Sequence, residues 1–289
     1  MPHWRRGREQ HLARVLWRFW SSSLAAELEY QANALVELLA VLGNLAGSLF
    51  MLSLLYSHGR DLGGWSWNAA IVVLGLYTLL DGFTSCLLQP NLSKIVSHVQ
   101  NGSLDFVLLK PIDSQLHLST RQISPWGIPG VLAGLALSGW GLIQRWPGDP
   151  AEFWRRPEAL AAQLVGPVAV GPVAVGLALL LAAAAILYSL WFVLASLSIW
   201  FVKIWNATEV LRSVLVAGRY PVSAYPPALR LLFTFVLPVT FLTTVPAEAL
   251  IGRGSWQWAL GSLLVALLCL SGTRVFWHHA LRHYTSASS

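Results

Sequence analysis

Carboxylates and amides stand inside runs of the sequence that are otherwise apolar. Asn33, Glu37 and Asn44 fall on one side of a helix of 3.6 residues per turn, and Asp81 interrupts the next apolar run. A charge inside a membrane span is costly, so it usually faces protein or a water-filled cavity and marks a path for an ion or substrate. A polar stripe also serves simply to pack helices together. The residues alone leave both interpretations open.

The sequence lacks the common motifs of catalysis and metal binding. It has no G-x-x-x-x-G-K-[ST] phosphate loop and no H-E-x-x-H zinc motif. Cys86 and Cys269 each lie in an apolar run, which favours free thiols over a disulfide or a metal site. His278, His279 and His283 gather near the basic C-terminus, where a solvated end is the simpler interpretation. We expect no catalytic residue, metal or cofactor in this chain.

The composition is that of a membrane protein. Of the 289 residues 55% are hydrophobic and 11% are charged, whereas soluble domains carry about 25% charged residues. Apolar runs long enough to cross the hydrocarbon core recur along the chain. We predict an all-α integral membrane protein with six transmembrane helices, at Ala34–Tyr56, Trp67–Leu88, Ser124–Ile143, Val168–Ser189 (with an alternative end at Trp205), Leu231–Val245 and Trp256–Trp277. The predicted divisions are an N-terminus (1–33), a six-span domain (34–280) and a tail (281–289).

The basic residues predict an orientation. With the N-terminus inside, 14 of the 19 lysines and arginines fall in inner segments and 5 in outer ones, and an excess of positive charge marks the cytoplasmic side. Both termini are then cytoplasmic, as are the loop after the second span and the segment Asn206–Arg230. The net charge of +6 indicates anionic lipid rather than nucleic acid as the partner.

An amphipathic segment precedes the first span. Between His11 and Ser23, the apolar residues Leu12, Val15, Leu16 and Phe19 recur at helical spacing, while arginines fall elsewhere around the helix. This pattern predicts an interfacial helix that lies on the membrane surface and leads into the first span as an elbow. It could serve as a plain anchor or also contact a cytoplasmic partner.

A short half-apolar segment, "NGSLDFVLLKPIDSQ" (101–115), lies between the second and third spans. Asn-Gly predicts a turn, Ser103 a helix cap, Asp105 a favourable charge in the first turn, and Pro111 the end of the helix. A helix of one or two turns is unstable alone. Its apolar residues therefore need a surface, either the membrane or a groove on another protein; they are Leu104, Phe106, Val107, Leu108 and Leu109.

The fifth apolar run is short and contains Pro238 and Pro246, which predicts a break or a kink within it. Proline lacks an N–H, so we expect Pro246 to end the helix. Residues Ala247–Gly252, with Glu248 among them, would then form a short outer segment that turns back toward the membrane. Gly252 and Gly254 permit such a reversal.

Together these features resemble the type-2 ABC transporter permeases. The resemblance rests on the elbow, the six spans and the helix of the first cytoplasmic loop, and it extends from about Leu24 to the C-terminus. "GSLDFVLLKPIDSQ" and "YPPALRLLFTFVLPVTFLTTVPAEALIG" look like one bacterial subgroup. Its members carry a G-x-L-D-x-x-L-x-[KR]-P segment and a P-A-x-x-L-x-G turn.

The resemblance implies an exporter permease of the bacterial inner membrane that works as a dimer, with an identical or related second permease, on two separate ATPase subunits. ATP and Mg²⁺ would bind to the ATPases alone. The residues implied in coupling are Ser103, Leu104, Asp105, Val107, Leu108, Lys110 and Pro111. Those implied in lining the pathway or the dimer are Asn33, Glu37, Asn44, Asp81, Pro238, Pro246 and Glu248. The family does not supply the substrate.

Two other classes compete with this interpretation. An ion-gradient-driven transporter or channel would use Glu37 and Asp81 as proton- or ion-linked carboxylates, although the two halves of the sequence show no inverted repeat. An integral membrane enzyme is disfavoured because catalytic clusters are missing from the sequence.

Overall fold

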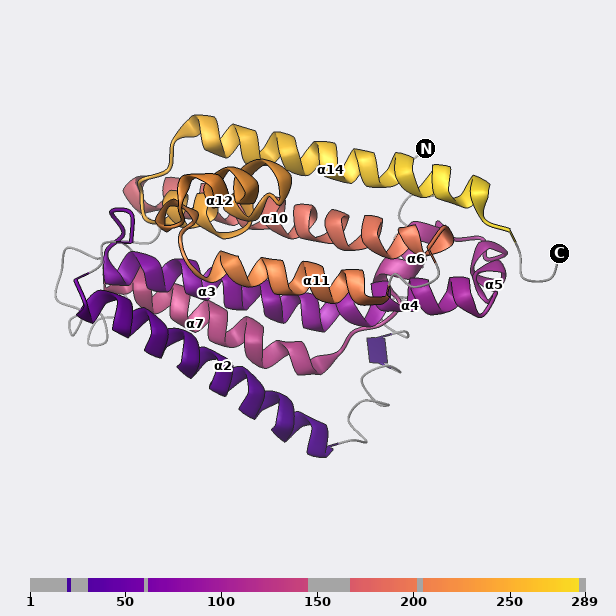
Figure 1. Cartoon of the computed structure of the whole chain (residues 1–289), viewed down its shortest axis with the longest axis horizontal. Coiled ribbons are helices and arrows are strands. Elements are labelled where there is room, and N and C mark those ends of the chain that lie inside the picture. The colour runs from indigo at the N-terminus through magenta and orange to yellow at the C-terminus, as the bar shows by residue number, and fades with distance from the viewer. Residues whose placement is uncertain (1–19, 22–30, 60–61, 145–166, 202–204, 286–289) are drawn as a thin grey trace.

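A computed structural model describes residues 20–21, 31–59, 62–144, 167–201 and 205–285, and within these ranges it contains helices and no strand (Figure 1). Five helices are long and apolar enough to cross a membrane, and a bent pair raises the number to as many as six. The five are Leu38–Ser57, Trp67–Gln100, Pro125–Ile143, Gly171–Ile199 and Trp256–His283. The all-α membrane prediction is therefore confirmed, with differences in the second and fifth spans.

The second span runs well beyond its predicted end at Leu88. Helix α3 (Trp67–Phe83) continues through a π-helical turn, η1 (Thr84–Leu88), into α4 (Gln89–Gln100). Pro90 cannot donate to a carbonyl of the preceding turn, and the Cys86 carbonyl instead accepts from the Ser124 N–H at 2.8 Å. Twelve further residues carry the helix about 18 Å past the predicted boundary. Polar Gln89 and Asn91 hid this extension from a hydrophobicity pattern.

Glycines hold α3 against α7 (Ile128–Ile143). A Cβ on Gly134 would collide with the backbone of Leu79, and one on Gly82 with the backbone of Val131. The two backbones therefore approach as closely as small residues allow, which is the usual way to pack helices in lipid. We call this contact the glycine seam; its residues are Gly75, Gly82, Gly127, Gly130, Gly134, Ser138 and Gly141.

The chain between α10 (Pro167–Ser196) and α14 (Trp256–His283) traverses the bundle. It starts with α11 (Trp205–Leu215) and the 3₁₀ turn η4 (Val216–Arg219). Arg212 reaches Ser85 of the second span, Arg219 lies over the Tyr77 ring, and Ser223 accepts from the Trp65 indole at 2.9 Å. From Arg212 to Ser223 the contacts of this segment move from Ser85 back to Trp65, so the segment runs antiparallel to α3.

The prediction that Asn206–Arg230 forms one cytoplasmic loop is therefore wrong. Trp65 stands at one end of the 34-residue helix Trp67–Gln100 and α5 (Leu104–Leu108) at the other. Because Ser223 reaches Trp65, the segment leaves the α5 end and arrives at the opposite end, hereafter the Trp65 end. Its arginines and Glu209 make it too polar to read as a span.

The predicted fifth span, Leu231–Val245, is not one helix. It is divided between two helices, Pro227–Val236 and Thr240–Leu250, that meet at 79°. Both ends of the pair lie at the Trp65 end, because Arg230 donates to the Ser223 carbonyl (2.6 Å) and Arg253 to the Gly64 carbonyl (3.0 Å). The pair is therefore a re-entrant hairpin.

The break in this hairpin falls beside Pro238. Pro246 does not end a helix, contrary to the prediction: it lies where the π-helical turn η7 (Thr240–Thr244) continues into α13 (Val245–Leu250), within the helical arm Thr240–Leu250. The chain reverses after α13 at Gly252, whose φ of +73° is in the left-handed region, as predicted.

The main core fills the space between α4, α10 and α14, around Trp191, Phe192 and Trp277. Helix α2 (Gln31–Ser57) packs on α3 and α7 but leaves large side chains such as Leu35 and Phe50 exposed, and it diverges from α3 toward its N-terminus (Figure 1). Most of the predicted elbow lies outside the described residues. Trp20 belongs to it and donates to the Thr120 carbonyl at 3.1 Å.

Candidate functional site

The predicted coupling segment forms a short helix at the far tip of α4. Helix α5 covers Leu104–Leu108 with Asp105 in its first turn, as predicted, and its last N–H bond comes from Lys110, just before Pro111. Ser103 does not cap it with its side chain. The Ser103 hydroxyl instead pairs with His98 Nδ1 of α4 at 2.7 Å. The helix is thereby tied back to α4.

The apolar residues of α5 divide into two sets. Leu104 and Val107 are buried in the main core, with exposed fractions of 0% and 3%. Phe106 and Leu109 are 71% and 81% exposed, and Leu108 is 39% exposed. Leu104 and Val107 therefore anchor α5 to the bundle and are not available to a partner, contrary to the prediction. The three exposed side chains form what we call the tip patch.

A positively charged neighbourhood surrounds His117 beside α5. Lys110 Nζ lies 3.2 Å from His117 Nε2. Burial, together with the charges of Lys110, Arg121 and His98, lowers the pKa of His117 to about 4. His117 is therefore neutral at pH 7, and Lys110 donates to its ring nitrogen.

Helix α6 (Ser114–Thr120) follows α5 and connects it to the long helices. Asp113 caps α6 by accepting from the Leu116 N–H at 3.0 Å and pairs with Arg274 of α14. The Arg274 hydrogen bond is the main cause that lowers the pKa of Asp113. Gln115 and Ser119 both bond the Tyr188 hydroxyl of α10, at 3.1 and 2.9 Å. A movement of the loop would thus be transmitted to α10 and α14 through these contacts.

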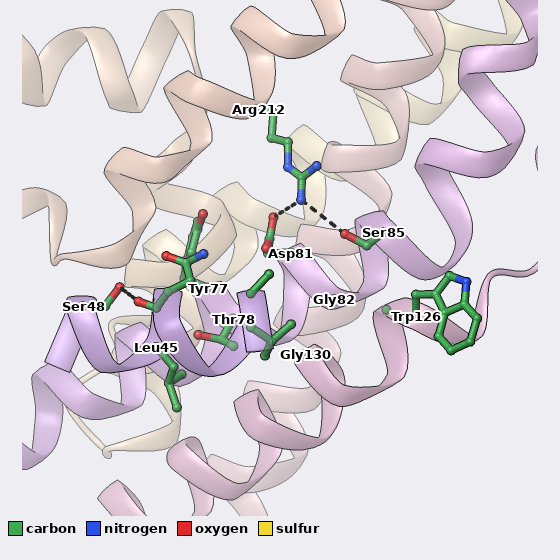
Figure 2. A pocket seen from close by; sticks show the side chains of 14 residues that line it. Leu45, Ser48, Tyr77, Thr78, Asp81, Gly82, Ser85, Trp126, Gly130 and Arg212 are labelled. Carbon is green, nitrogen blue, oxygen red and sulfur yellow. Dashed lines mark hydrogen bonds and ion pairs between the residues drawn. The ribbon is translucent and has the colours of Figure 1, made fainter. Parts of the chain in front are cut away.

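A cavity of about 100 Å³ lies between α2, α3, α7 and α11 (Figure 2). Apolar residues such as Leu45 and Trp126 form part of its lining, and we call it the polar cavity after the polar side chains that face it. Asn44 and Ser48 of α2 and Tyr77 and Asp81 of α3 line it, and Arg212 of α11 closes one side. Of the predicted pathway residues, Asn44 and Asp81 meet here. The side chains of Asn33 and Glu37 lie outside the described residues.

Arg212 is the residue that sequence reasoning missed. Its guanidinium lies 3.5 Å from Asp81 Oδ1, 3.3 Å from Ser85 Oγ and 3.3 Å from Gln89 Oε1. The side chains of Arg212 and Asp81 are 35% and 27% exposed. A signal did exist, because the apolar residues Val210, Leu211, Val214, Leu215 and Val216 surround this arginine in the sequence.

The remaining predicted residues lie elsewhere. Pro238 marks the break of the re-entrant hairpin, and Pro246 and Glu248 lie on its second arm near the Trp65 end. They do not line the polar cavity. Within the described ranges, no group of three or more His, Cys, Asp or Glu is placed to hold a metal ion.

The long apolar helices, the re-entrant hairpin and the helical loop at one end define a multi-pass helical membrane protein. The particular family follows from the sequence. The family described as ABC-2 family transporter protein matches residues 42–145 and 168–288, so the chain belongs to the ABC-2 transporter family. No curated protein and no solved structure shows significant similarity to the chain.

Proposed function

We propose that this chain is the membrane permease of an ATP-driven exporter and that separate ATPase subunits dock on the tip patch. Family membership favours an ABC permease over a gradient-driven carrier. The single observation that supports the docking surface is the tip patch itself: Phe106, Leu108 and Leu109 project from a helix held about 18 Å beyond the predicted membrane boundary.

The tip patch is suited to transmitting force because α5 cannot move alone. Leu104 and Val107 fix it to the main core, and Ser103 fixes it to α4. Asp113 and Gln115 connect the same loop to α14 and α10. When ATP binding closes two ATPases, a push on α5 would therefore shift the second span together with α10 and α14.

The permease would work with a second copy, identical or related, and two ATPase subunits would bind ATP and Mg²⁺. This chain would supply no covalent chemistry. The α5 end would be cytoplasmic in a bacterial inner membrane. Removing Arg212, Arg219 and Arg230 from the predicted inner segments leaves 11 basic residues there, and adding Arg230 to the opposite side makes 6. The inner segments therefore still hold more basic residues than the outer ones, which supports a cytoplasmic α5 end.

Leu109→Asp tests the docking surface. Burying one such side chain stabilises a complex by about 1.5–3 kcal/mol, so we expect at least a tenfold loss of co-purified ATPase. The substitution removes an exposed side chain, and insertion and thermal unfolding of the permease should not change. The measurement is the ATPase-to-permease ratio after affinity purification from membranes, followed by permease-stimulated ATP hydrolysis.

Two matched variants make this test specific. Leu109→Met keeps an apolar side chain of similar size and should retain the partner. Val107→Ala removes methyl groups from a buried side chain and should lower stability by about 1–3 kcal/mol without abolishing docking. If Leu109→Asp co-purifies ATPase as well as the natural chain does, the tip patch is not the docking surface.

Cysteine labelling tests the orientation. On a background with Cys86→Ala and Cys269→Ala, a cysteine at Lys110 should react with a membrane-impermeant maleimide only after the cells are opened. A cysteine at Arg253, at the Trp65 end, should react in intact cells. Equal labelling of the two positions from outside would contradict the orientation, whatever the result for Leu109.

A further inference from the structure

Three charged residues meet where α11 and η4 pack on α3, and their charges do not cancel. Arg212 and Arg219 come from α11 and η4, and Asp81 comes from α3. Glu209, one turn before Arg212, makes no ion pair with it. Tyr77 and Asp81 lie about 15 and 21 Å along the helix from Trp67, so this contact is at membrane depth. The contact carries one excess positive charge.

Arg212 holds its partners loosely. All three of its contacts, to Asp81, Ser85 and Gln89, are 3.3–3.5 Å long, whereas a charge-assisted hydrogen bond is normally about 2.7–2.9 Å. A guanidinium has five N–H donors in a planar fork that fits carboxylate and phosphate oxygens. Arg212 therefore has donors to spare, and its side chain lines the polar cavity in Figure 2.

Arg219 has even less compensation. Its Cζ lies 5.1 Å from the centre of the Tyr77 ring, and its Nε is buried with no hydrogen-bond partner among the described residues. No described carboxylate lies within ion-pair distance of it. A cation at membrane depth is costly unless an anion or water compensates it. The α3 helix that supplies a carboxylate, Asp81, to Arg212 offers Arg219 an uncharged partner, the ring and hydroxyl of Tyr77.

The size of the cavity limits what Arg212 can bind. About 100 Å³ is well below the roughly 300–1,000 Å³ of a pocket that encloses a drug-sized ligand. It fits one small polar group, such as a phosphate or carboxylate. Asn44, Ser48, Thr78 and Ser85 add further hydrogen-bonding groups around it. The bulk of a larger molecule would have to lie outside, next to the exposed α2.

We propose that the polar cavity is an anion-binding subsite, in which Arg212 takes the single negatively charged group of an amphiphilic substrate and Asp81 is the internal competitor that the group displaces. This inference deepens the proposed function, because it names the substrate class as anionic. Arg219 adds a second positive charge on the path toward the Trp65 end.

Binding to the purified full chain, without ATPase, tests the proposal. The chain is held in a neutral maltoside detergent and titrated with dihexanoyl phosphatidylglycerol, with dihexanoyl phosphatidylcholine, or with inorganic phosphate. Binding is followed by calorimetry and by the ligand-induced change in the unfolding temperature. We expect the phosphatidylglycerol to bind the natural chain about tenfold more tightly than the phosphatidylcholine.

The variants should change the affinity for phosphatidylglycerol in different directions. Arg212→Gln should weaken binding about tenfold, Arg219→Gln about threefold, and Arg212→Lys less than Arg212→Gln because the charge remains. Asp81→Asn should tighten binding about three- to tenfold, because the competing carboxylate is removed. Arg282→Gln on α14 makes the same charge change far from the cavity and should stay within about twofold.

Each outcome decides the proposal. If Asp81→Asn weakens binding as much as Arg212→Gln does, the pair is only a structural contact and the proposal fails. If Arg282→Gln weakens binding equally, the attraction is non-specific and the proposal also fails. Inorganic phosphate binding as tightly as phosphatidylglycerol supports the anion subsite but assigns it to a soluble anion, contradicting the amphiphilic substrate. Loss of ATPase docking in Leu109→Asp is independent of all these results.

Discussion

Helix α3 uses two of its faces in opposite ways. Toward α7 it presents the glycine seam, where backbones touch and almost no polar side chain intervenes. Toward α11 and η4 it presents Tyr77 and Asp81, which meet Arg219 and Arg212; we call this contact the arginine seam. The first contact has no space for rearrangement. The second has long polar contacts and cavities on both sides.

The difference between these two faces indicates where movement can occur in this fold. Close packing of small residues gains many weak attractive contacts, all of which are lost if the helices separate. Loosely held ionic contacts can exchange partners at little cost, because charged groups in a polar cavity find water or another ligand. We expect α3 and α7 to move as one body and α11 to shift relative to them.

The largest expected effect comes from filling the glycine seam. In Gly134→Leu the new side chain would meet the backbones of Leu79 and Gly75, so we expect a loss of about 3 kcal/mol or more, or failure to fold. Gly139→Leu, on the same helix α7, has nothing within 4 Å and should change stability little. Thermal unfolding in detergent and the yield of inserted protein measure both. Equal effects of the two substitutions would refute the rigid seam.

A smaller effect should come from acid, acting on the polar loop beside α5. The pKa of His117 is about 4 in the folded chain and about 6.5 in an unfolded one. Between these values the unfolded state binds more protons, so stability falls as the pH drops from about 6.5 to 4, by roughly 1–3 kcal/mol. His117→Gln should flatten this dependence.

The pH dependence of unfolding also distinguishes the polar loop beside α5 from the glycine seam. Thermal unfolding between pH 7.5 and 4 should show the slope in the natural chain and in Gly139→Leu alike, because Gly139 has nothing within 4 Å and lies apart from His117. An unchanged slope in His117→Gln would assign the acid response to other groups.

The smallest expected effect concerns the ion pair of the arginine seam. Asp81 and Arg212 are 3.5 Å apart and partly exposed, so a double-mutant cycle with Asp81→Asn and Arg212→Gln should give a coupling of about 1 kcal/mol or less. The measurement is the unfolding free energy of the four proteins. A coupling of several kcal/mol would show that this contact is held firmly. It would contradict the difference that we infer between the arginine seam and the glycine seam.

Hydrophobicity predicted most of the long helices, because crossing the hydrocarbon core imposes about 20 apolar residues whatever the fold. It failed where the bundle satisfies polar groups internally. In α4, Asn91 donates to the carbonyls of Leu87 and Gln122 and accepts from the Gln122 N–H. In α11, Arg212 finds Asp81. Both segments therefore looked like loops in the sequence.

For the candidate sites, local chemistry was predicted and long-range contacts were not. Turn, charge and proline signals located α5 between Gly102 and Pro111. The sequence did not indicate that Leu104 and Val107 face the core while Phe106 and Leu109 face outward, because a run of four apolar residues, Phe106–Leu109, has no helical period. The sequence marked Asp81 as a candidate pathway residue but did not indicate that Arg212 is its partner.

Composition and local signals suffice to identify this chain as a helical membrane protein of the ABC-2 family with a short helix after the second span, since they act over a few residues. Three features follow from packing and not from local sequence: which polar residues are paired, that α11 crosses the bundle while the proline-broken run re-enters, and which side of α5 is exposed. These depend on contacts between Ser223 and Trp65, or Arg212 and Asp81, more than 100 residues apart. No local pattern records them, because a polar residue at membrane depth is tolerated only where distant parts of the chain supply its partner.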